Sequence, residues 1–149
     1  MKIDIPDVVA MEQLGGKLAK QATIGNTIFL QGELGTGKTT LVRGFLRGLG
    51  HTGIVKSPTY TLIEPYLFNG HKIYHIDLYR LNSTEELEAI GLRDYFDGQG
   101  ICLLEWPEKA VDFLGTPDLW IGIEYLQAHR QVELVARTSS GSSIIKDIH

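Results

Sequence analysis

One segment, residues 32–39, restricts the fold of this chain more than any other. It reads GELGTGKT and matches the phosphate-binding loop pattern G-x-x-x-x-G-K-[ST] at every fixed position. The apolar residues 27–30 before it predict a buried strand, and residues 40–49 after it predict a helix. A phosphate-binding loop requires this strand–loop–helix order, so the segment indicates an α/β fold.

The residue types in this segment suit a backbone that wraps around phosphates. Gly32, Gly35 and Gly37 permit positive φ angles and a close approach of backbone N–H groups, and the following helix directs the positive end of its dipole at the anion. Lys38 adds a charge that can reach the β- and γ-phosphates, and Thr39 offers a hydroxyl to Mg²⁺. The alternative is a chance glycine-rich turn before a helix. The predicted nucleotide-binding residues here are Gly35, Thr36, Gly37, Lys38, Thr39 and Thr40.

Length and composition predict one globular domain over residues 1–149. The chain is 43% hydrophobic and 21% charged, which is ordinary for a protein with a packed core. It has no apolar run of the ~20 residues that a membrane span needs, and its N-terminus lacks a signal-peptide pattern. The single cysteine, Cys102, has no partner for an internal disulfide. We therefore expect a cytoplasmic protein without a membrane partner.

Net charge argues against a protein that holds nucleic acid by itself. The chain carries −4 at pH 7, whereas proteins that grip nucleic acids through phosphates are usually basic. Positive charge gathers in residues 34–63, which contain no acid. We interpret this stretch as a phosphate site followed by a solvated helix face. The other interpretation is a surface that meets an acidic partner.

The pattern along the chain predicts an α/β fold: a P-loop NTPase-like mixed sheet with flanking helices and antiparallel hairpins in the second half. Asn69 and Gly70 indicate a tight hairpin turn, because both turn positions tolerate positive φ. Two hairpins are expected, formed by residues 60–68 with 72–76 and by residues 119–126 with 132–137.

Other segments predict how the remaining elements begin, end or are buried. Asp7 can cap a first helix. The continuous apolar run 101–104 is typical of a parallel strand that is buried on both faces. Residues 138–143 are polar, and we expect them to be loose.

A phosphate-bound Mg²⁺ needs a further carboxylate, and two candidates follow apolar strands. Ligands of open α/β sheets lie beyond the carboxyl ends of the parallel strands, so we assign Glu105, after residues 101–104, to the metal. The alternative is a solvated acid at a strand end. Asp77 ends a hairpin strand and could orient water, support the metal, or pair structurally with Arg80 or a helix N-terminus. His75 shares a strand face with Asp77 and is interpreted as its structural neighbour.

Residues 56–61, KSPTYT, follow the predicted helix at the place where nucleotide-switch loops occur. A hydroxyl such as that of Thr59 could contact the γ-phosphate and Mg²⁺, which would order this segment only when a triphosphate is bound. The alternative is a proline-stiffened loop that enters a strand.

Four segments in this order resemble the TsaE (also called YjeE) family, the small bacterial ATPases of tRNA threonylcarbamoyladenosine biosynthesis. They are GELGTGKTT at 32–40, SPTYTL at 57–62, HIDLYRL at 75–81 and LEWPE at 104–108. The loop alone is generic, whereas the H-x-D-L-Y-R and E-W-P segments are specific. The resemblance spans about Pro6 to Arg137. Thr36 stands where the family usually has alanine, a small change that should not disturb the loop.

The resemblance implies binding and slow hydrolysis of ATP to ADP with Mg²⁺. It also implies two partners, the TsaD and TsaB proteins, which transfer a threonylcarbamoyl group to the adenosine beside the anticodon of tRNA. The tRNA would be reached indirectly, through these partners. By match to the family motifs, the catalytic residues are Lys38, Asp77 and Glu105: Lys38 and Thr39 hold phosphate and metal, Glu105 completes the metal site, and Asp77 is needed for turnover.

Two further residues are candidates for nucleotide contact. Trp106, in the E-W-P segment, is expected to serve the active site or a partner surface, and the alternative is a core tryptophan. Arg130 lies in the predicted turn of the second hairpin and could reach the nucleotide. An exposed turn arginine without such a role is the other interpretation.

Three rival classes share parts of this pattern. A small-molecule kinase usually needs an arginine-rich lid, whereas residues 91–120 contain only Arg93 and Lys109 as bases. A GTPase needs an N-K-x-D motif, and no Asn-Lys pair occurs. A non-hydrolysing nucleotide sensor is not separable by sequence from a slow ATPase, so turnover measurements decide between them.

Overall fold

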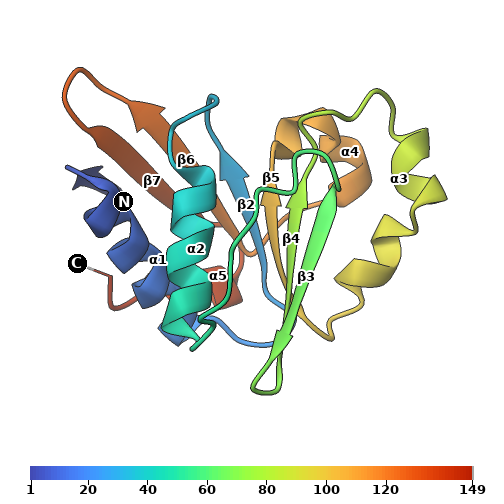
Figure 1. The fold of residues 1–149 in the computed structure, drawn as a ribbon, viewed down its shortest axis with the longest axis horizontal. Helices are drawn as coiled ribbons and strands as arrows, with labels where there is room; N and C mark the ends of the chain where they lie inside the picture. Colours follow the sequence, from blue (N-terminus) through green and yellow to red (C-terminus); the bar gives the residue numbers. More distant parts are fainter. Residues whose placement is uncertain (149) are drawn as a thin grey trace.

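A seven-stranded mixed sheet forms the centre of the molecule, in the order β1-β7-β6-β2-β5-β4-β3. The computed structural model describes residues 1–148. The strands are β1 (Lys2–Ile5), β2 (Thr27–Gln31), β3 (Ile63–Phe68), β4 (His71–Asp77), β5 (Ile101–Glu105), β6 (Leu119–Tyr125) and β7 (Arg130–Ala136). Helices flank this sheet (Figure 1), and the predicted fold class is confirmed.

Helices connect most of the strands, and one helix follows the last strand. They are α1 (Val8–Gln21), α2 (Lys38–Gly48), α3 (Glu85–Ala89), α4 (Val111–Leu114), α5 (Ser139–Ile145) and two short 3₁₀ helices, η1 (Leu92–Phe96) and η2 (Pro107–Lys109). Within residues 1–148 none of them has the length and apolar character needed to cross a membrane.

The four central strands are parallel, and antiparallel hairpins extend the sheet on both sides. β2 pairs in parallel with β5 and β6, and β5 pairs in parallel with β4. β5 is buried along its whole length, as its continuous apolar run predicts. The antiparallel pairs β3–β4 and β6–β7 are the two predicted hairpins. The carboxyl ends of β2, β4, β5 and β6 therefore meet at one edge, where ligands of such sheets lie.

The hairpin turns agree with the sequence, with small changes at the strand ends. Asn69 and Gly70 have φ angles of 49° and 79°, as a two-residue turn of positive φ requires. β3 begins at Ile63, so residues 60–62 belong to the preceding turn. β7 begins at Arg130, which places this arginine at the start of a strand and corrects its predicted position inside the turn.

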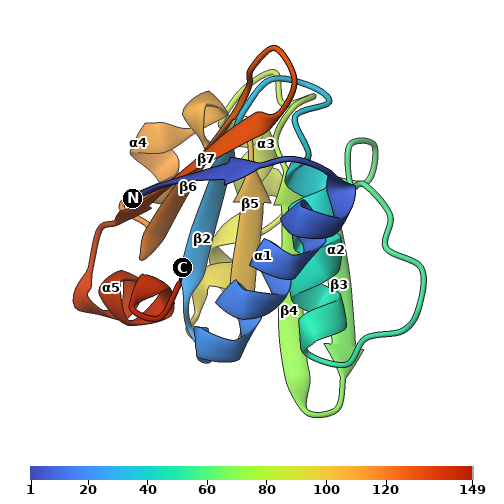
Figure 2. The ribbon, with the colours of Figure 1, turned by 90° about the vertical axis from the view of Figure 1, so that its left-hand side faces the viewer.

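Two apolar cores lie on opposite faces of the sheet. The first joins α1, α2 and α5 to β6 and β7, and the second lies under α3, η1 and α4. Helices α1 and α2 lie side by side (Figure 2) and pack so closely that an added Cβ on Gly15 would lie 2.2 Å from the Leu41 carbonyl oxygen. On Gly44 it would lie 2.1 Å from the Glu12 carbonyl oxygen. This contact fixes the position of α2, whose first residue is Lys38.

Both ends of the chain contain more regular structure than the sequence predicts. Asp7 caps α1 as expected, because its Oδ1 accepts a hydrogen bond of 2.8 Å from Ala10 N. The preceding residues form β1, which pairs with β7 and was not predicted. The segment expected to be loose forms α5, capped by Thr138, whose Oγ1 accepts from Gly141 N at 3.1 Å. A tertiary contact explains this helix, since Gly141 packs against the Asp118 carbonyl.

Candidate functional site

The loop between β2 and α2 forms one side of a pocket of about 280 Å³ at the carboxyl ends of the parallel strands. Segments that are far apart in the sequence meet there: the loop, residues 57–59, and the ends of β4 and β5. Eight of the predicted site residues line this pocket: Gly35, Gly37, Lys38, Thr39, Thr40, Asp77, Glu105 and Trp106.

The loop backbone has the geometry of an anion cradle at two of its three glycines. Gly35 and Gly37 have φ angles of 79° and 110°, and an added Cβ on Gly35 would meet no atom within 4 Å. Gly32 differs, because its φ is not positive; a side chain there would lie 2.7 Å from the Ile123 carbonyl oxygen. Gly37 caps α2 without a side-chain hydrogen bond. The first N–H groups of this helix thus have no partner within it, and they belong to residues that line the pocket.

Lys38 is nearly buried, with 5% of its surface exposed. Its ammonium group donates a hydrogen bond to the Gly32 carbonyl and lies 3.9 Å above the ring of Trp106. Burial lowers the pKa of Lys38, and the carboxylates of Glu105 and Asp77 oppose this shift. An anion bound beside the ammonium would favour its charged form further.

Trp106 contributes a strained backbone as well as an aromatic ring. Its φ and ψ are 61° and 49°, the left-handed region that non-glycine residues rarely adopt. The ring also packs at 5.0 Å from the ring of Tyr79 and against the second apolar core. Trp106 is therefore a wall of the pocket and a partly buried residue of the core at the same time.

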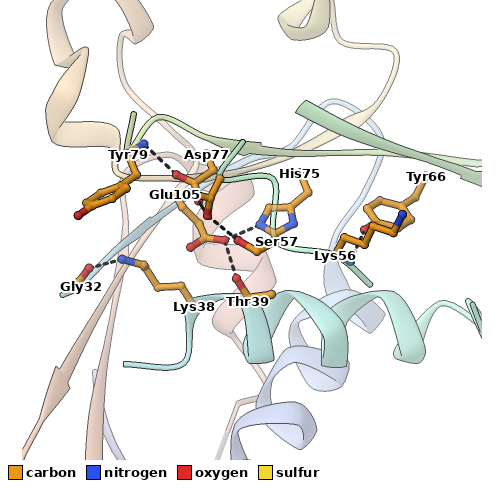
Figure 3. Close-up of polar contacts among 11 residues, drawn as sticks. Gly32, Lys38, Thr39, Lys56, Ser57, Tyr66, His75, Asp77, Tyr79 and Glu105 are labelled. Carbon is orange, nitrogen blue, oxygen red and sulfur yellow. Dashed lines mark hydrogen bonds and ion pairs between the residues drawn. The ribbon is translucent and has the colours of Figure 1, made fainter. Parts of the chain in front are cut away.

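Asp77 and Glu105 are register partners at the ends of β4 and β5, and each is 3% exposed. Glu105 Oε2 accepts hydrogen bonds from Thr39 Oγ1 at 3.1 Å and from His75 Nε2 at 2.5 Å. Figure 3 shows both contacts meeting at one oxygen. Glu105 is therefore held against the start of α2, which rules out a solvated acid at a strand end.

Asp77 is held by the segment that follows it and by the loop 56–61. Its Oδ1 accepts from Tyr79 N at 2.8 Å, and its Oδ2 accepts from Thr59 Oγ1 at 3.2 Å. Ser57 Oγ lies 2.8 Å from Thr59 Oγ1 and extends this network. Burial raises the pKa of Asp77; the Tyr79 N–H partly offsets this, and the charge of Glu105 adds to it.

The structure excludes one alternative for Asp77 and gives His75 a hydrogen-bond partner. Arg80 does not pair with Asp77; its guanidinium stacks at 4.6 Å on the ring of Tyr60. His75, interpreted as a structural neighbour of Asp77, makes its hydrogen bond to Glu105, the register partner of Asp77. The spacing of His75 and Asp77 shows only that they share a face, and the cross-strand register decides which carboxylate the imidazole reaches.

Thr36 and Arg130 lie outside the pocket. The Thr36 hydroxyl donates to the Glu33 carbonyl at 2.9 Å. Thr36 lines a second hollow of about 420 Å³, which Gly32 and Glu33 also line. Arg130 Nη2 donates to the Gly35 carbonyl at 3.1 Å. With Val8, this arginine borders a small cavity of about 80 Å³ that adjoins the loop.

The donor atoms of the pocket suit a hard cation that shares phosphate ligands. Thr39 and Glu105 offer hydroxyl and carboxylate oxygens, and Asp77 lies beside them. Within residues 1–148, no group of three or more His, Cys, Asp or Glu side chains is arranged to hold a metal by itself. Mg²⁺ fits such a site, because it usually takes one or two carboxylates and completes its shell with phosphates and water.

The mixed sheet, with a loop of this pattern between β2 and α2, defines a protein of the P-loop fold. A model of the family described as threonylcarbamoyl adenosine biosynthesis protein TsaE matches residues 5–133. The chain belongs to the TsaE family.

Relatives and a solved structure support this assignment. The chain is 49% identical over 146 residues to the tRNA threonylcarbamoyladenosine biosynthesis protein TsaE of Haemophilus influenzae, covering 95% of this chain and 92% of that protein. It is 46% identical over 113 residues to the TsaE protein of a Synechocystis species, covering 73% and 71%. The crystal structure of YdiB from Bacillus subtilis superposes with a TM-score of 0.82 and 30% identity, covering 99% of this chain and 92% of that one.

Proposed function

We propose that this protein binds ATP with Mg²⁺, hydrolyses it slowly, and serves the threonylcarbamoyladenosine modification of tRNA. One observation carries the biochemical part: the start of α2, with Lys38, faces two buried carboxylates, Asp77 and Glu105, across a single pocket. The biological part rests on membership of the TsaE family.

The loop and α2 would hold the phosphates. The positive φ angles of Gly35 and Gly37 let backbone N–H groups turn toward an anion, and the helix dipole favours negative charge at Lys38 and Thr39. The Lys38 ammonium is already held between a carbonyl and an aromatic ring. Little side-chain freedom is therefore lost when it pairs with a phosphate.

Thr39 and Glu105 would hold Mg²⁺ together with the phosphates. Bound there, the ion would neutralise charge on the phosphates and polarise the phosphoryl oxygens. The hydrogen bond of 3.1 Å between Thr39 Oγ1 and Glu105 Oε2 shows that both groups reach one point.

Asp77 would orient the water that attacks the terminal phosphate. A raised pKa makes a carboxylate a better proton acceptor near neutral pH, and burial raises the pKa of Asp77 in this direction. The bonds from Tyr79 N and Thr59 fix the plane of the carboxylate.

Arg130 would border the nucleoside. It lies beside the Thr40 end of the loop, in the small cavity that it shares with Val8 and Met11. Its hydrogen bond to the Gly35 carbonyl also holds the loop itself, so its loss should affect loop geometry as well as contact with the base.

A nucleotide-dependent conformational change would act on the TsaD and TsaB proteins, the partners that the family resemblance implies. Residues 56–61 lack regular structure and reach the site through the contact of Thr59 with Asp77. ATP and ADP would favour different arrangements of this segment, to the extent that each binds the arrangements with different affinity. The acidic net charge of −4 fits a protein that acts on a protein complex rather than on tRNA directly.

The first measurement is ATP turnover by the purified protein, alone and with purified TsaD and TsaB. The second is competition between ATP and GTP for binding. The third is a pull-down of the partners with ATP, with ADP and with no nucleotide. We expect slow turnover, preference for ATP, and partner binding that depends on the nucleotide. Tighter binding of GTP would contradict the ATPase proposal. Binding without turnover under every condition would indicate a nucleotide sensor. Equal partner binding in all nucleotide states, with tight tRNA binding at physiological salt, would indicate a direct RNA role.

A further inference from the structure

His75 is a buried polar residue in the site that the phosphate-binding loop motif does not account for. Its side chain is 0% exposed, and its Nε2 lies 2.5 Å from Glu105 Oε2. Its register partner in β5 is Leu103, so the imidazole reaches diagonally across the two strands to Glu105 (Figure 3).

The direction of this hydrogen bond follows from the chemistry of the two groups. An ionised carboxylate can only accept, so Nε2 carries the hydrogen and donates it. Nδ1 is buried and has no hydrogen-bond partner within the described residues. The tautomer with its hydrogen on Nε2 suits this environment, because the hydrogen then lies where an acceptor is present.

Two donors therefore converge on the same oxygen of Glu105. Thr39 Oγ1 and His75 Nε2 both reach Oε2, one from the start of α2 and one from the middle of the sheet. A carboxylate held at one oxygen from two directions has little freedom to rotate. Its other oxygen, Oε1, is left to serve the pocket that Glu105 lines.

We propose that His75 is a positioning residue for the metal site: it fixes the carboxylate of Glu105 in the orientation that holds Mg²⁺ beside the phosphates. This inference rests on the proposed function of the site and assigns the orientation of Glu105 to a residue outside the loop. Hydrogen-bond partners behind a metal ligand commonly change metal affinity by about 10- to 100-fold, so the effect should be measurable.

The experiment compares three variants of the full chain. His75→Phe removes the donor and keeps a ring, His75→Gln keeps a donor near the position of Nε2, and His71→Phe is the matched control at the other end of β4. Calorimetry gives the dissociation constant of a non-hydrolysable ATP analogue across a series of MgCl₂ concentrations. For His75→Phe we expect the Mg²⁺ concentration at half-maximal effect to rise by about 10-fold or more. His75→Gln should lie between this variant and the wild type, and His71→Phe should match the wild type.

A readout without Mg²⁺ separates positioning from a merely structural role. Binding of the analogue in the absence of Mg²⁺ should be the same for His75→Phe and the wild type. In a Glu105→Gln background, His75→Phe should have no further effect on the Mg²⁺ dependence, because the residue acts through Glu105. Weaker binding with and without Mg²⁺, and in both backgrounds, would overturn the proposal.

The design distinguishes this inference from the function on which it rests. A wild-type protein without Mg²⁺-dependent binding would overturn the proposed function and this inference together. Mg²⁺-dependent binding that His75→Phe leaves unchanged would overturn this inference alone. If His75→Phe does not fold, His75→Asn takes its place with the same expected result, because the shorter amide does not reach Oε2.

Discussion

Two neighbouring glycines of α1 should respond in opposite directions to the same substitution. A Cβ added to Gly15 would lie 2.2 Å from the Leu41 carbonyl oxygen and 2.7 Å from Phe45 N. A Cβ added to Gly16 would meet nothing closer than the Gly44 carbonyl oxygen at 3.6 Å, which is ordinary contact. Gly16→Ala is thus the matched control for Gly15→Ala.

The magnitude for Gly15→Ala follows from the distance and from helix propensity. Ordinary contact begins at 3.4 Å, so the 2.2 Å approach is too close by about 1.2 Å (3.4 Å less 2.2 Å). Overpacking a core costs about 1–3 kcal/mol, and the atoms here belong to the backbone of α2, which cannot rotate away. Alanine favours the helix by about 1 kcal/mol over glycine. Taking the upper end of the cost, we expect a net loss of about 2 kcal/mol.

The assay is urea unfolding followed by circular dichroism, with thermal unfolding as a second measure. A loss of about 2 kcal/mol lowers Tm by about 4–8 °C in a domain of this size. Gly16→Ala should instead raise the free energy of unfolding by about 0.5–1 kcal/mol, the ordinary gain in a helix. If Gly15→Ala stabilised the protein as much as Gly16→Ala, the two helices could not be as close as the structure has them.

Three further predictions concern the site. Lys38→Ala should weaken nucleotide binding or turnover by about 10²-fold, the scale of one preorganised charged group, with an unchanged circular dichroism spectrum; unchanged binding and turnover would contradict the assignment of the loop. Glu105→Ala should weaken the Mg²⁺ dependence of ATP binding, whereas Asp77→Ala should lower kcat more than affinity; the reverse pattern in steady-state kinetics and calorimetry would mean that the two carboxylates have exchanged roles. Burial raises the folded-state pKa of the Asp77 carboxyl above its unfolded value of about 3.9. The protonated carboxyl therefore contributes its full stabilisation below that unfolded pKa, and this stabilisation is lost as the pH rises through the folded pKa. Asp77→Asn, which does not ionise, should therefore unfold at higher urea than the wild type at pH 7, and this difference should vanish below about pH 4; an equal difference at both pH values would contradict this.

The sequence predicted the elements that depend on local chemistry. The loop between β2 and α2, the Asn69–Gly70 turn and the Asp7 cap each follow from residue types that favour one backbone geometry. The burial of β5 follows from a continuous apolar run. These signals lie within a few residues of the structure that they predict, so no knowledge of distant contacts was needed.

Elements that depend on distant partners were missed. β1 is a short strand that exists because it pairs with β7, more than a hundred positions later in the chain. α5 looked like a loose polar tail, but Gly141 allows it to pack against the Asp118 carbonyl and to bury Ile144. In both cases tertiary contact overrides a weak local preference.

In the site, too, the sequence predicted the positions of single residues but not the contacts between strands. The position of Asp77 and Glu105 after strands indicated that both lie at the ligand-binding edge. Their positions opposite each other on adjacent strands, and the contact of His75 with Glu105, depend on the register of β4 against β5. Register is a relation between two strands, and neither strand contains it alone.

The packing of α1 against α2 and the geometry of the site are parts of one arrangement. Lys38 and Thr39 are the first residues of α2, and Thr39 Oγ1 lies 3.1 Å from a carboxylate that belongs to β5. A shift of α2 by half an ångström outward would lengthen this contact beyond the range of a good hydrogen bond. Glycines let the backbones of α1 and α2 approach closely, so no flexible side chains lie between the two helices at this contact. The close helix contact thus holds the Lys38 ammonium and the Thr39 hydroxyl at a fixed distance from Asp77 and Glu105. A substitution at Gly15, outside the pocket, should therefore weaken Mg²⁺-dependent nucleotide binding as well as stability.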